Sequence, residues 1–220
     1  MEEIRSFLRA FPPRRRWAYL AGLGFLACGI TMNTKTGLGV SPVISVAYCI
    51  AELLGINFSV MTFLYYAFLI LVQLLLLGRK FHHIQWLQLL TSFLTSALID
   101  VFDRVLPAAE AIPLRGAELL LAIVLTGIGV ILTVGAEFVP NPADGTAQAI
   151  SLRTGKSLGL SKNLLDLISI GVTLALGLLL RQRVIGVGIG TVVTMLLTGR
   201  AVALLQKPVL RIAGLETKQP

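Results

Sequence analysis

Charged residues, histidines and cysteines are all scarce in this chain. Only 14% of its 220 residues are Asp, Glu, Lys or Arg, and only two are His. Soluble domains carry about 25% charged residues, so the composition excludes an ordinary soluble protein. The two cysteines, Cys28 and Cys49, lie inside apolar runs, which favours buried thiols over a disulfide. His82 and His83 have no carboxylate or thiol cluster beside them, so no metal site is expected.

Motifs of common catalytic and nucleotide sites are also missing. Gly155-Lys156-Ser157 has the ending of a phosphate-binding loop, but that loop needs a glycine where Ile150 stands. No nucleophile motif or metal-ligand spacing accompanies it. We therefore expect no enzyme activity and no cofactor.

Apolar residues, in contrast, make up 55% of the chain and form long uninterrupted runs. A backbone in lipid must satisfy its own hydrogen bonds, so each run is expected to be a helix. A span needs roughly 20 residues, and the runs are extended accordingly. The sequence thus predicts an all-α polytopic membrane protein whose long helices cover 17–36, 58–78, 84–105, 117–138, 161–181 and 184–206.

The net charge of +8 sits mostly at the ends of these segments. Such charges are typical of cytoplasmic flanks that face anionic lipid, rather than of a nucleic-acid site. Arg14, Arg15 and Arg16 precede Trp17, an interfacial anchor, so residues 1–16 are predicted to be a cytoplasmic segment. Residues 207–220 are predicted to be a cytoplasmic tail. We expect a multi-pass protein of a bacterial plasma membrane with both termini inside.

Two shorter elements, Val40–Leu54 and Asp144–Lys156, occupy equivalent places in two halves of the chain. The halves are 17–105 and 117–206, joined by a linker over 106–116. Short matches support a duplication, with offsets of 103 to 106 residues. They pair Gly22-Leu-Gly24 with Gly127-Ile-Gly129, Gly39–Ser45 with Gly145–Ser151, Leu54-Gly55 with Leu158-Gly159, and Leu94-Thr-Ser96 with Leu197-Thr-Gly199.

The orientation of the halves depends on whether the short elements cross the membrane. Eight crossings would make the halves parallel, and six would make the second half inverted. A lipid-facing helix with Arg153 and Lys156 would cost several kcal/mol, about 2.5–3.5 for each charge at mid-membrane. The sequence therefore favours three plus three inverted long helices, with the short elements as half-helices or re-entrant segments.

The N-termini of the two short elements are the predicted substrate site. Free N–H groups and the positive end of a helix dipole attract an anion or a polar solute. The alternative is structural: Asp144 caps its helix and the glycines pack helices together. The candidate residues are Gly37, Gly39, Ser41, Ser45, Asn141, Asp144, Gly145, Thr146, Gln148 and Arg153, with Arg153 supplying positive charge.

Asn141-Pro142-Ala143 spells the water-channel triplet, yet the triplet occurs once and has no counterpart in the first half. A water channel is therefore not favoured. Among charges inside helices, Asp100 and Arg200 are predicted either to form an intramembrane ion pair between the halves or to extend to an interface. Asp166 is predicted to pair with Lys162, four residues earlier on one helix.

Several motifs resemble the YczE/YyaS/YitT-like family of bacterial integral membrane proteins, nearest its YczE branch. Thr36-Gly-Leu-Gly-Val-Ser-Pro42 is similar to that family's Gly-x-Gly-x-Ser-Pro, and Pro142-Ala-Asp-Gly145 with Arg153-Thr-Gly155 to its Pro-Arg-Asp-Gly and Arg-x-Gly. Gly188-Ile-Gly-Thr191 and Ile99-Asp100 also resemble family motifs. The chain departs from the pattern at Val43, where an aromatic is usual, and at Ala143, where Arg is usual. The resemblance covers 20–205 and implies the architecture, without a transport substrate.

The function favoured by these features is a small transporter or permease for a polar or anionic small molecule. The alternative is a non-transporting membrane partner, either an assembly factor or the substrate-binding subunit of a larger transport complex. Glycines at 186, 188 and 190 would suit helix–helix contact with a membrane partner or a second copy. An intramembrane enzyme is the least favoured function.

Overall fold

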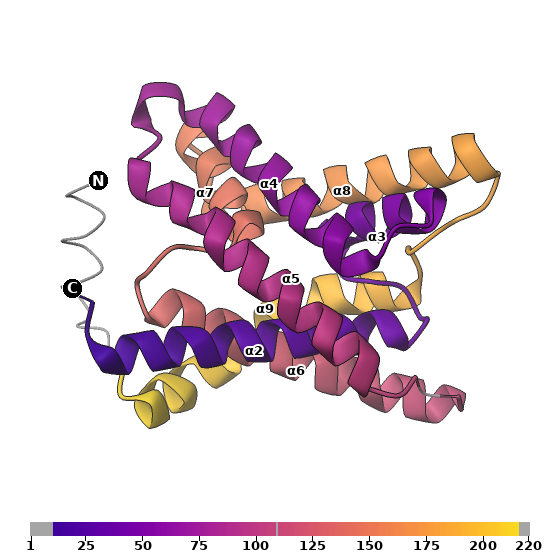
Figure 1. Cartoon of the computed structure of the whole chain (residues 1–220), viewed down its shortest axis with the longest axis horizontal. Helices are drawn as coiled ribbons and strands as arrows, with labels where there is room; N and C mark the ends of the chain where they lie inside the picture. The colour runs from indigo at the N-terminus through magenta and orange to yellow at the C-terminus, as the bar shows by residue number, and fades with distance from the viewer. Residues whose placement is uncertain (1–10, 109, 216–220) are drawn as a thin grey trace.

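The computed structural model describes residues 11–108 and 110–215, and this part of the chain forms eight α-helices and no strand (Figure 1). Six helices are long: α2 (Pro13–Lys35), α4 (Phe58–Leu77), α5 (Leu87–Val105), α6 (Ile112–Gly135), α8 (Leu158–Arg181) and α9 (Ile189–Ala213). Two are short: α3 (Pro42–Leu54) and α7 (Pro142–Thr154). The 3₁₀ turns η1 (Gly78–Lys80) and η2 (His83–Trp86) join α4 to α5. The predicted segments 1–16 and 207–220 lie partly outside the described residues.

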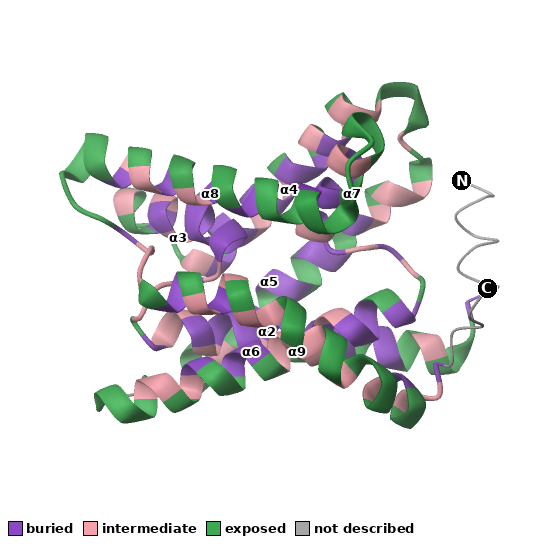
Figure 2. Cartoon of the chain, turned by 180° about the vertical axis from the view of Figure 1, so that it is seen from behind, coloured by how far each residue is buried: buried purple, intermediate pink, exposed green. Residues whose placement is uncertain are grey.

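The predicted all-α membrane architecture is confirmed. Five long helices, all except α2, are apolar and long enough to cross a membrane. The mean hydropathy of α2 is lowered by the arginines at its start and the polar residues at its end. Large apolar side chains such as Leu75 and Leu179 are more than 80% exposed, and exposed residues follow the outer face of α8 (Figure 2). Such a surface is stable in lipid rather than in water.

Several helix boundaries differ from those predicted: α2 begins at Pro13 rather than at residue 17, and α9 begins at Ile189 rather than at residue 184. α6 begins at Ile112, inside the predicted linker, and α9 continues through Pro208 to Ala213, into the predicted tail. Proline removes only one N–H from a helix, and an interrupted backbone would leave more groups unpaired. α7 begins at Pro142 rather than Asp144, because Asn141 caps it by accepting a hydrogen bond from the Ala143 N–H.

α2 and α6 cross in antiparallel directions and touch through glycines. A Cβ on Gly29 would lie 2.7 Å from the backbone N of Thr126, and a Cβ on Gly129 would lie 2.5 Å from the backbone N of Leu26. The backbones can approach this closely only because these glycines have no side chain. The two contacts are reciprocal, since each residue in one contact is 100 positions from a residue in the other.

The short helices are alike in length and in their ends. Each has 13 residues, with proline at its first turn and a left-handed glycine after its last residue, Gly55 or Gly155. Corresponding ends are therefore 100 residues apart, and the predicted offsets of 103 to 106 are wrong at these helices. The short sequence matches consisted of common residues. The offset between the two helices is instead defined by the prolines and glycines at their ends.

The ends of the bundle differ in charge. At one end, Arg14 donates to the Ala213 carbonyl and Arg15 pairs with Glu137, so the start of α2 meets the ends of α6 and α9. We call this the basic end. At the opposite end Lys35 pairs with Asp103, 3.2 Å away, so α2 and α5 both end there. Figure 1 shows α7 toward the basic end and α3 toward the opposite end.

Candidate functional site

A central cavity of about 240 Å³ lies between the N-termini of α3 and α7. Leu26, Ile30 and Tyr66, from the middles of α2 and α4, form part of its wall, so it lies near mid-depth in the bundle. Polar groups reach it from six helices or their N-caps. These residues are Ser41, Tyr66, Thr126, Asn141, Asp144, Lys162, Asn163, Asp166, Thr194 and Thr198.

The N-terminus of α7 is fixed by a buried amide network. Gln73 on α4 and Gln88 on α5 exchange hydrogen bonds of 3.1 and 3.0 Å, and Gln73 also donates to the Pro142 carbonyl. Gly145 fits against this network, since a Cβ there would lie 2.7 Å from Gln73 Oε1. Thr146 donates to the carbonyl of Pro142 at 2.7 Å. These contacts hold the start of α7 beside the cavity.

The N-terminus of α3 is held differently. Ser41 makes no side-chain cap, and Ser45 bonds to the Pro42 carbonyl and to Thr173 on α8, at 2.6 and 2.7 Å. The preceding loop packs on the start of α9, where the Gly190 N–H donates to the Leu38 carbonyl. Gly39, with φ of 112°, has room there only for a hydrogen, because a Cβ would lie 2.5 Å from the Gly188 N. Its role in this structure is packing.

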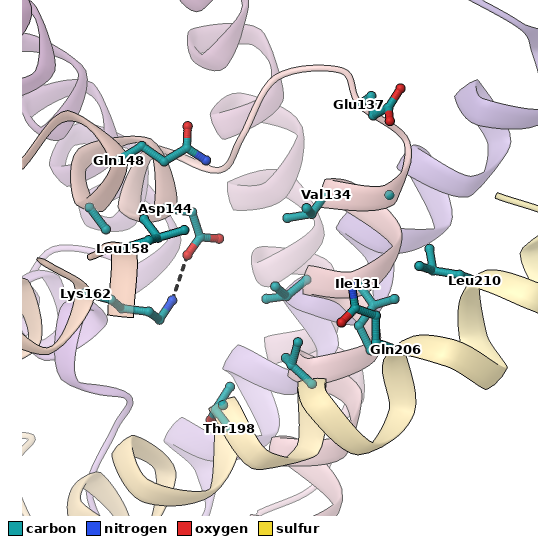
Figure 3. A pocket seen from close by; sticks show the side chains of 15 residues that line it. Ile131, Val134, Glu137, Asp144, Gln148, Leu158, Lys162, Thr198, Gln206 and Leu210 are labelled. Atoms are coloured by element: carbon teal, nitrogen blue, oxygen red, sulfur yellow. Dashed lines mark hydrogen bonds and ion pairs between the residues drawn. The ribbon is translucent and has the colours of Figure 1, made fainter. Parts of the chain in front are cut away.

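Three charged residues gather on one side of the cavity, and we call Asp144, Lys162 and Asp166 the charged cluster. Lys162 Nζ lies 2.7 Å from Asp144 Oδ1, as Figure 3 shows, and it also interacts electrostatically with Asp166. The Asp144 side chain is 19% exposed and that of Lys162 46% exposed, and both line the cavity. Asp166 is only 7% exposed. Lys162 thus interacts with Asp166, as predicted, but its salt bridge runs from α8 to Asp144 on α7.

A second cavity of about 460 Å³ connects the central cavity to the basic end, and we call it the vestibule. It shares Asp144, Lys162 and Thr198 with the central cavity and extends to Glu137 and Gln206 (Figure 3). It exists because α8 and α9 scarcely touch within the described chain. The corresponding helices of the first half, α4 and α5, pack together, with the Phe63 and Phe93 rings 6.1 Å apart.

The structure brings only some of the predicted site residues together. Ser41, Asn141 and Asp144 line the central cavity, and Gln148 lines the vestibule. Ser45, Gly145 and Thr146 are buried in helix packing beside it, as described above for each of them. Gly37 is exposed, with the place of its missing Cβ 3.7 Å from the Arg115 side chain. Arg153 is exposed on the last turn of α7 and lines neither cavity.

The predicted ion pair between Asp100 and Arg200 is wrong. Asp100 pairs with Arg104, 2.7 Å away and one turn later on the same helix, and it also accepts from Asn57 at 3.3 Å. Arg200 is exposed on α9. A carboxylate near the end of α5 reaches a local partner more easily than one on the other half.

Residues 13–207 match a family described as a family of unknown function, DUF6198. The chain belongs to this family. The DUF6198 match spans every helix of the bundle except the last turns of α9, so the cavity and the charged cluster fall inside it. No curated protein and no solved structure matches the chain. The family therefore supplies no activity, and the function must be argued from the cavity.

Proposed function

We propose that this DUF6198 protein is a small transporter that carries a small polar solute through the central cavity. The observation that carries the proposal is a mid-depth cavity that receives polar side chains from six helices or their N-caps within a mainly apolar wall, and that adjoins a vestibule extending toward the basic end. Transporters built from inverted repeats bind their solutes in such a place, between the ends of broken helices. The proposed architecture resembles that implied by the YczE-like motifs.

The reciprocal contacts support two inverted halves. Ser45 on α3 meets Thr173 on α8, and Gly145 on α7 meets Gln73 on α4. The residues of the first contact are 100 positions from those of the second, as in the crossing of α2 with α6. In a two-fold arrangement residue i contacts j while the equivalent of j contacts the equivalent of i. Because α2 and α6 are antiparallel, the two-fold axis would lie in the membrane plane.

The charges at the two ends support an orientation with the basic end and both termini in the cytoplasm of a bacterial cell. The basic end has more Lys and Arg than the opposite end, and cytoplasmic loops carry this excess. We place at the basic end the start of α2, the α4–α5 turn, the α7–α8 turn and the end of α9 (Figure 1), which carry Arg14, Arg15, Arg16, Arg79, Lys80, Arg153, Lys156, Lys207 and Arg211. We place at the opposite end the end of α2, the α5–α6 connection and the α8–α9 connection, which carry Lys35, Arg104, Arg115, Arg181 and Arg183.

The walls of the central cavity favour a small neutral or zwitterionic solute over an anion. Its volume is below the roughly 300–1,000 Å³ of drug-sized pockets. Hydroxyl and amide groups of Ser41, Asn141 and Tyr66 offer hydrogen bonds. Lys162 is its one cation among the described residues and is already paired with Asp144, and Arg153 lies elsewhere. An excess anion would therefore meet no free positive side chain.

The proposed transport cycle alternates between two openings. The state described here opens to the basic end between α8 and α9, while α4 and α5 close the equivalent gap. In the other state α8 and α9 would close and α4 and α5 would separate. A solute shifts this equilibrium only as far as its affinity differs between the two states.

A matched pair of threonines tests the cycle. Thr198 lines the vestibule, whereas Thr95, its counterpart on α5, is 1% exposed. In a background without Cys28 and Cys49, we expect an impermeant thiol reagent to label Thr198→Cys in inside-out vesicles and to leave Thr95→Cys unlabelled. A transported solute should slow labelling of Thr198→Cys and permit labelling of Thr95→Cys from outside.

Single cysteines in two loops check the topology. Lys80→Cys should be labelled only from the cytoplasm and Arg183→Cys only from outside. Labelling of both from one side would refute the inverted halves. Correct sidedness with no solute able to change the Thr95 and Thr198 accessibilities would refute transport and leave an accessory role.

A further inference from the structure

The charged cluster has more negative than positive groups. Asp144 and Asp166 both act on the single ammonium of Lys162, and Asp166 is 7% exposed. When all three are ionised, the cluster has one unbalanced negative charge. A net charge inside a membrane protein costs several kcal/mol unless it is paired. The cluster is therefore one cation short of neutrality.

We infer that Asp166 binds the proton that couples to transport, an inference that rests on the proposed function. A proton that enters through the vestibule adds to a carboxylate oxygen of Asp166, and an O–H bond forms there. Lys162 then keeps Asp144 as its one charged partner, and the cluster is neutral. In the other state the same O–H bond breaks, and the proton leaves through the opposite opening.

The charged and titratable groups around Asp166 come from three helices. Lys162 on α8 and Asp144 on α7 are its charged neighbours, and Tyr65 and Tyr66 on α4 are its titratable ones. The described cavity residues from α2, α3, α6 and α9 are uncharged. Asp166 is thus a buried carboxyl group one helical turn from the Lys162 ammonium, with no other cation among the described cavity residues.

A proton fits this place better than a metal cation. Metal cations take several oxygen ligands, whereas the carboxylates among the described cavity residues are Asp166 and Asp144, and Asp144 is already paired with Lys162. The Lys162 ammonium, a few residues away on the same face of α8, would also repel a second cation. A proton needs only one oxygen atom and leaves no separate charge beside the ammonium.

Neutralisation explains how the proton would act on the helices. Asp144 and Lys162 of the charged cluster line the vestibule, which is the gap between α8 and α9, and Asp166 lines the central cavity that shares these two residues with it. Closing that gap removes water, so an unbalanced charge there would lose its solvation. Protonated Asp166 permits closure, and ionised Asp166 holds the vestibule open.

Infrared titration of the purified protein tests the proton site without any solute. The wild type should show a protonated carboxyl C=O band that titrates with pH, and Asp166→Asn should lose it. Asp100→Asn is the matched control, because Asp100 is an aspartate on a long helix paired with Arg104 at the opposite end. Asp166→Glu should keep a titrating band at a changed frequency. Persistence of the same band in Asp166→Asn would overturn the inference.

Labelling of Thr198→Cys provides the functional readout. Relative to the loop cysteine Lys80→Cys at the same pH, which corrects for the smaller thiolate fraction, lower pH should slow labelling of Thr198→Cys from the basic end by at least about tenfold, equivalent to about 1.4 kcal/mol of population shift. Adding Asp166→Asn should give slow labelling at every pH. Dependence on Na⁺ at constant pH, with choline as the control salt, would overturn the proton as the coupling ion. A titrating Asp166 band without alternating accessibility would instead refute the proposed transport and keep the proton site.

Discussion

The crossing of α2 and α6 yields the sharpest stability prediction. Replacing Gly129 with Ala would place a methyl group 2.5 Å from the Leu26 backbone N, 2.8 Å from its Cα and 2.9 Å from the Gly22 carbonyl O. The 2.5 Å approach is about 0.9 Å shorter than the 3.4 Å at which ordinary contact begins. All three neighbours are backbone atoms, so no side chain can move aside, and the helices must separate.

The expected cost follows from two opposing effects. Overpacking in a well-packed interior costs about 1–3 kcal/mol. Replacing glycine by alanine within a helix recovers roughly 0.5–1 kcal/mol. Gly129→Ala should therefore lower the free energy of unfolding by about 1–2 kcal/mol. Gly24→Ala, on the same pair of helices but with nothing within 4 Å of the new methyl, should leave it unchanged or raise it slightly.

The assay is unfolding by SDS in mixed micelles, followed by the fluorescence of Trp17 and Trp86. The two variants should differ by about 2 kcal/mol, up to about thirtyfold in the unfolding equilibrium constant. Gly29→Ala should behave like Gly129→Ala because the contacts are reciprocal. The double variant should cost less than the sum, since one separation relieves both sites. Equal stability of Gly129→Ala and Gly24→Ala would refute the close crossing.

Three further substitutions test the site. Lys162→Met leaves two carboxylates without their cation and should destabilise the protein by about 1–3 kcal/mol. Adding Asp144→Asn to the same chain should recover at least half of the resulting decrease in the SDS concentration at half-unfolding. Gln73→Leu leaves the buried Gln88 amide without its hydrogen-bond partner and should lower the free energy of unfolding by about 1–3 kcal/mol. Adding Gln88→Leu should recover part of that loss in the same assay. Arg153→Gln should change unfolding by less than about 0.5 kcal/mol and leave Thr198→Cys labelling unaltered, because Arg153 is exposed and lines neither cavity.

The helices could be predicted from the sequence because lipid makes apolar length decisive. The predicted starts and ends fall within a few residues of those of α4 and α8. Boundaries failed at the end of α9, which continues through Pro208 past the predicted end at residue 206, and at the start of α7, which was predicted at Asp144. Asn141 caps α7 instead, and Pro142 occupies its first turn.

The candidate site was predicted less completely, since tertiary contacts decide it. The two short-helix N-termini do face one cavity, as their equivalent positions indicated. Lys162 and Asp144 are 18 residues apart and meet only because α8 folds back beside α7. The spacing of four residues on one helix predicted Asp166 as the partner of Lys162. A local pattern cannot predict the salt bridge to Asp144, because Asp144 lies on another helix. Nothing in the sequence indicated that Gln73 and Gln88 would form a buried pair.

The two halves have several equivalent packing contacts but not equivalent charges, and α4 and α5 pack together where α8 and α9 scarcely touch. Counting back 100 positions from the charged cluster leads to Ile44, Thr62 and Tyr66, none of which carries a charge near neutral pH. Packing must be similar in the two halves if each can adopt the shape of the other, as an alternating cycle requires. The charges need not be similar in the two halves, because both halves line the same cavity at their interface. A second cluster there would add another unbalanced carboxylate to the same low-dielectric space and raise the cost of closing it. Under the proposed cycle, a single cluster would therefore suffice to control both openings, provided that α8 moves against α9 in one state and α4 against α5 in the other.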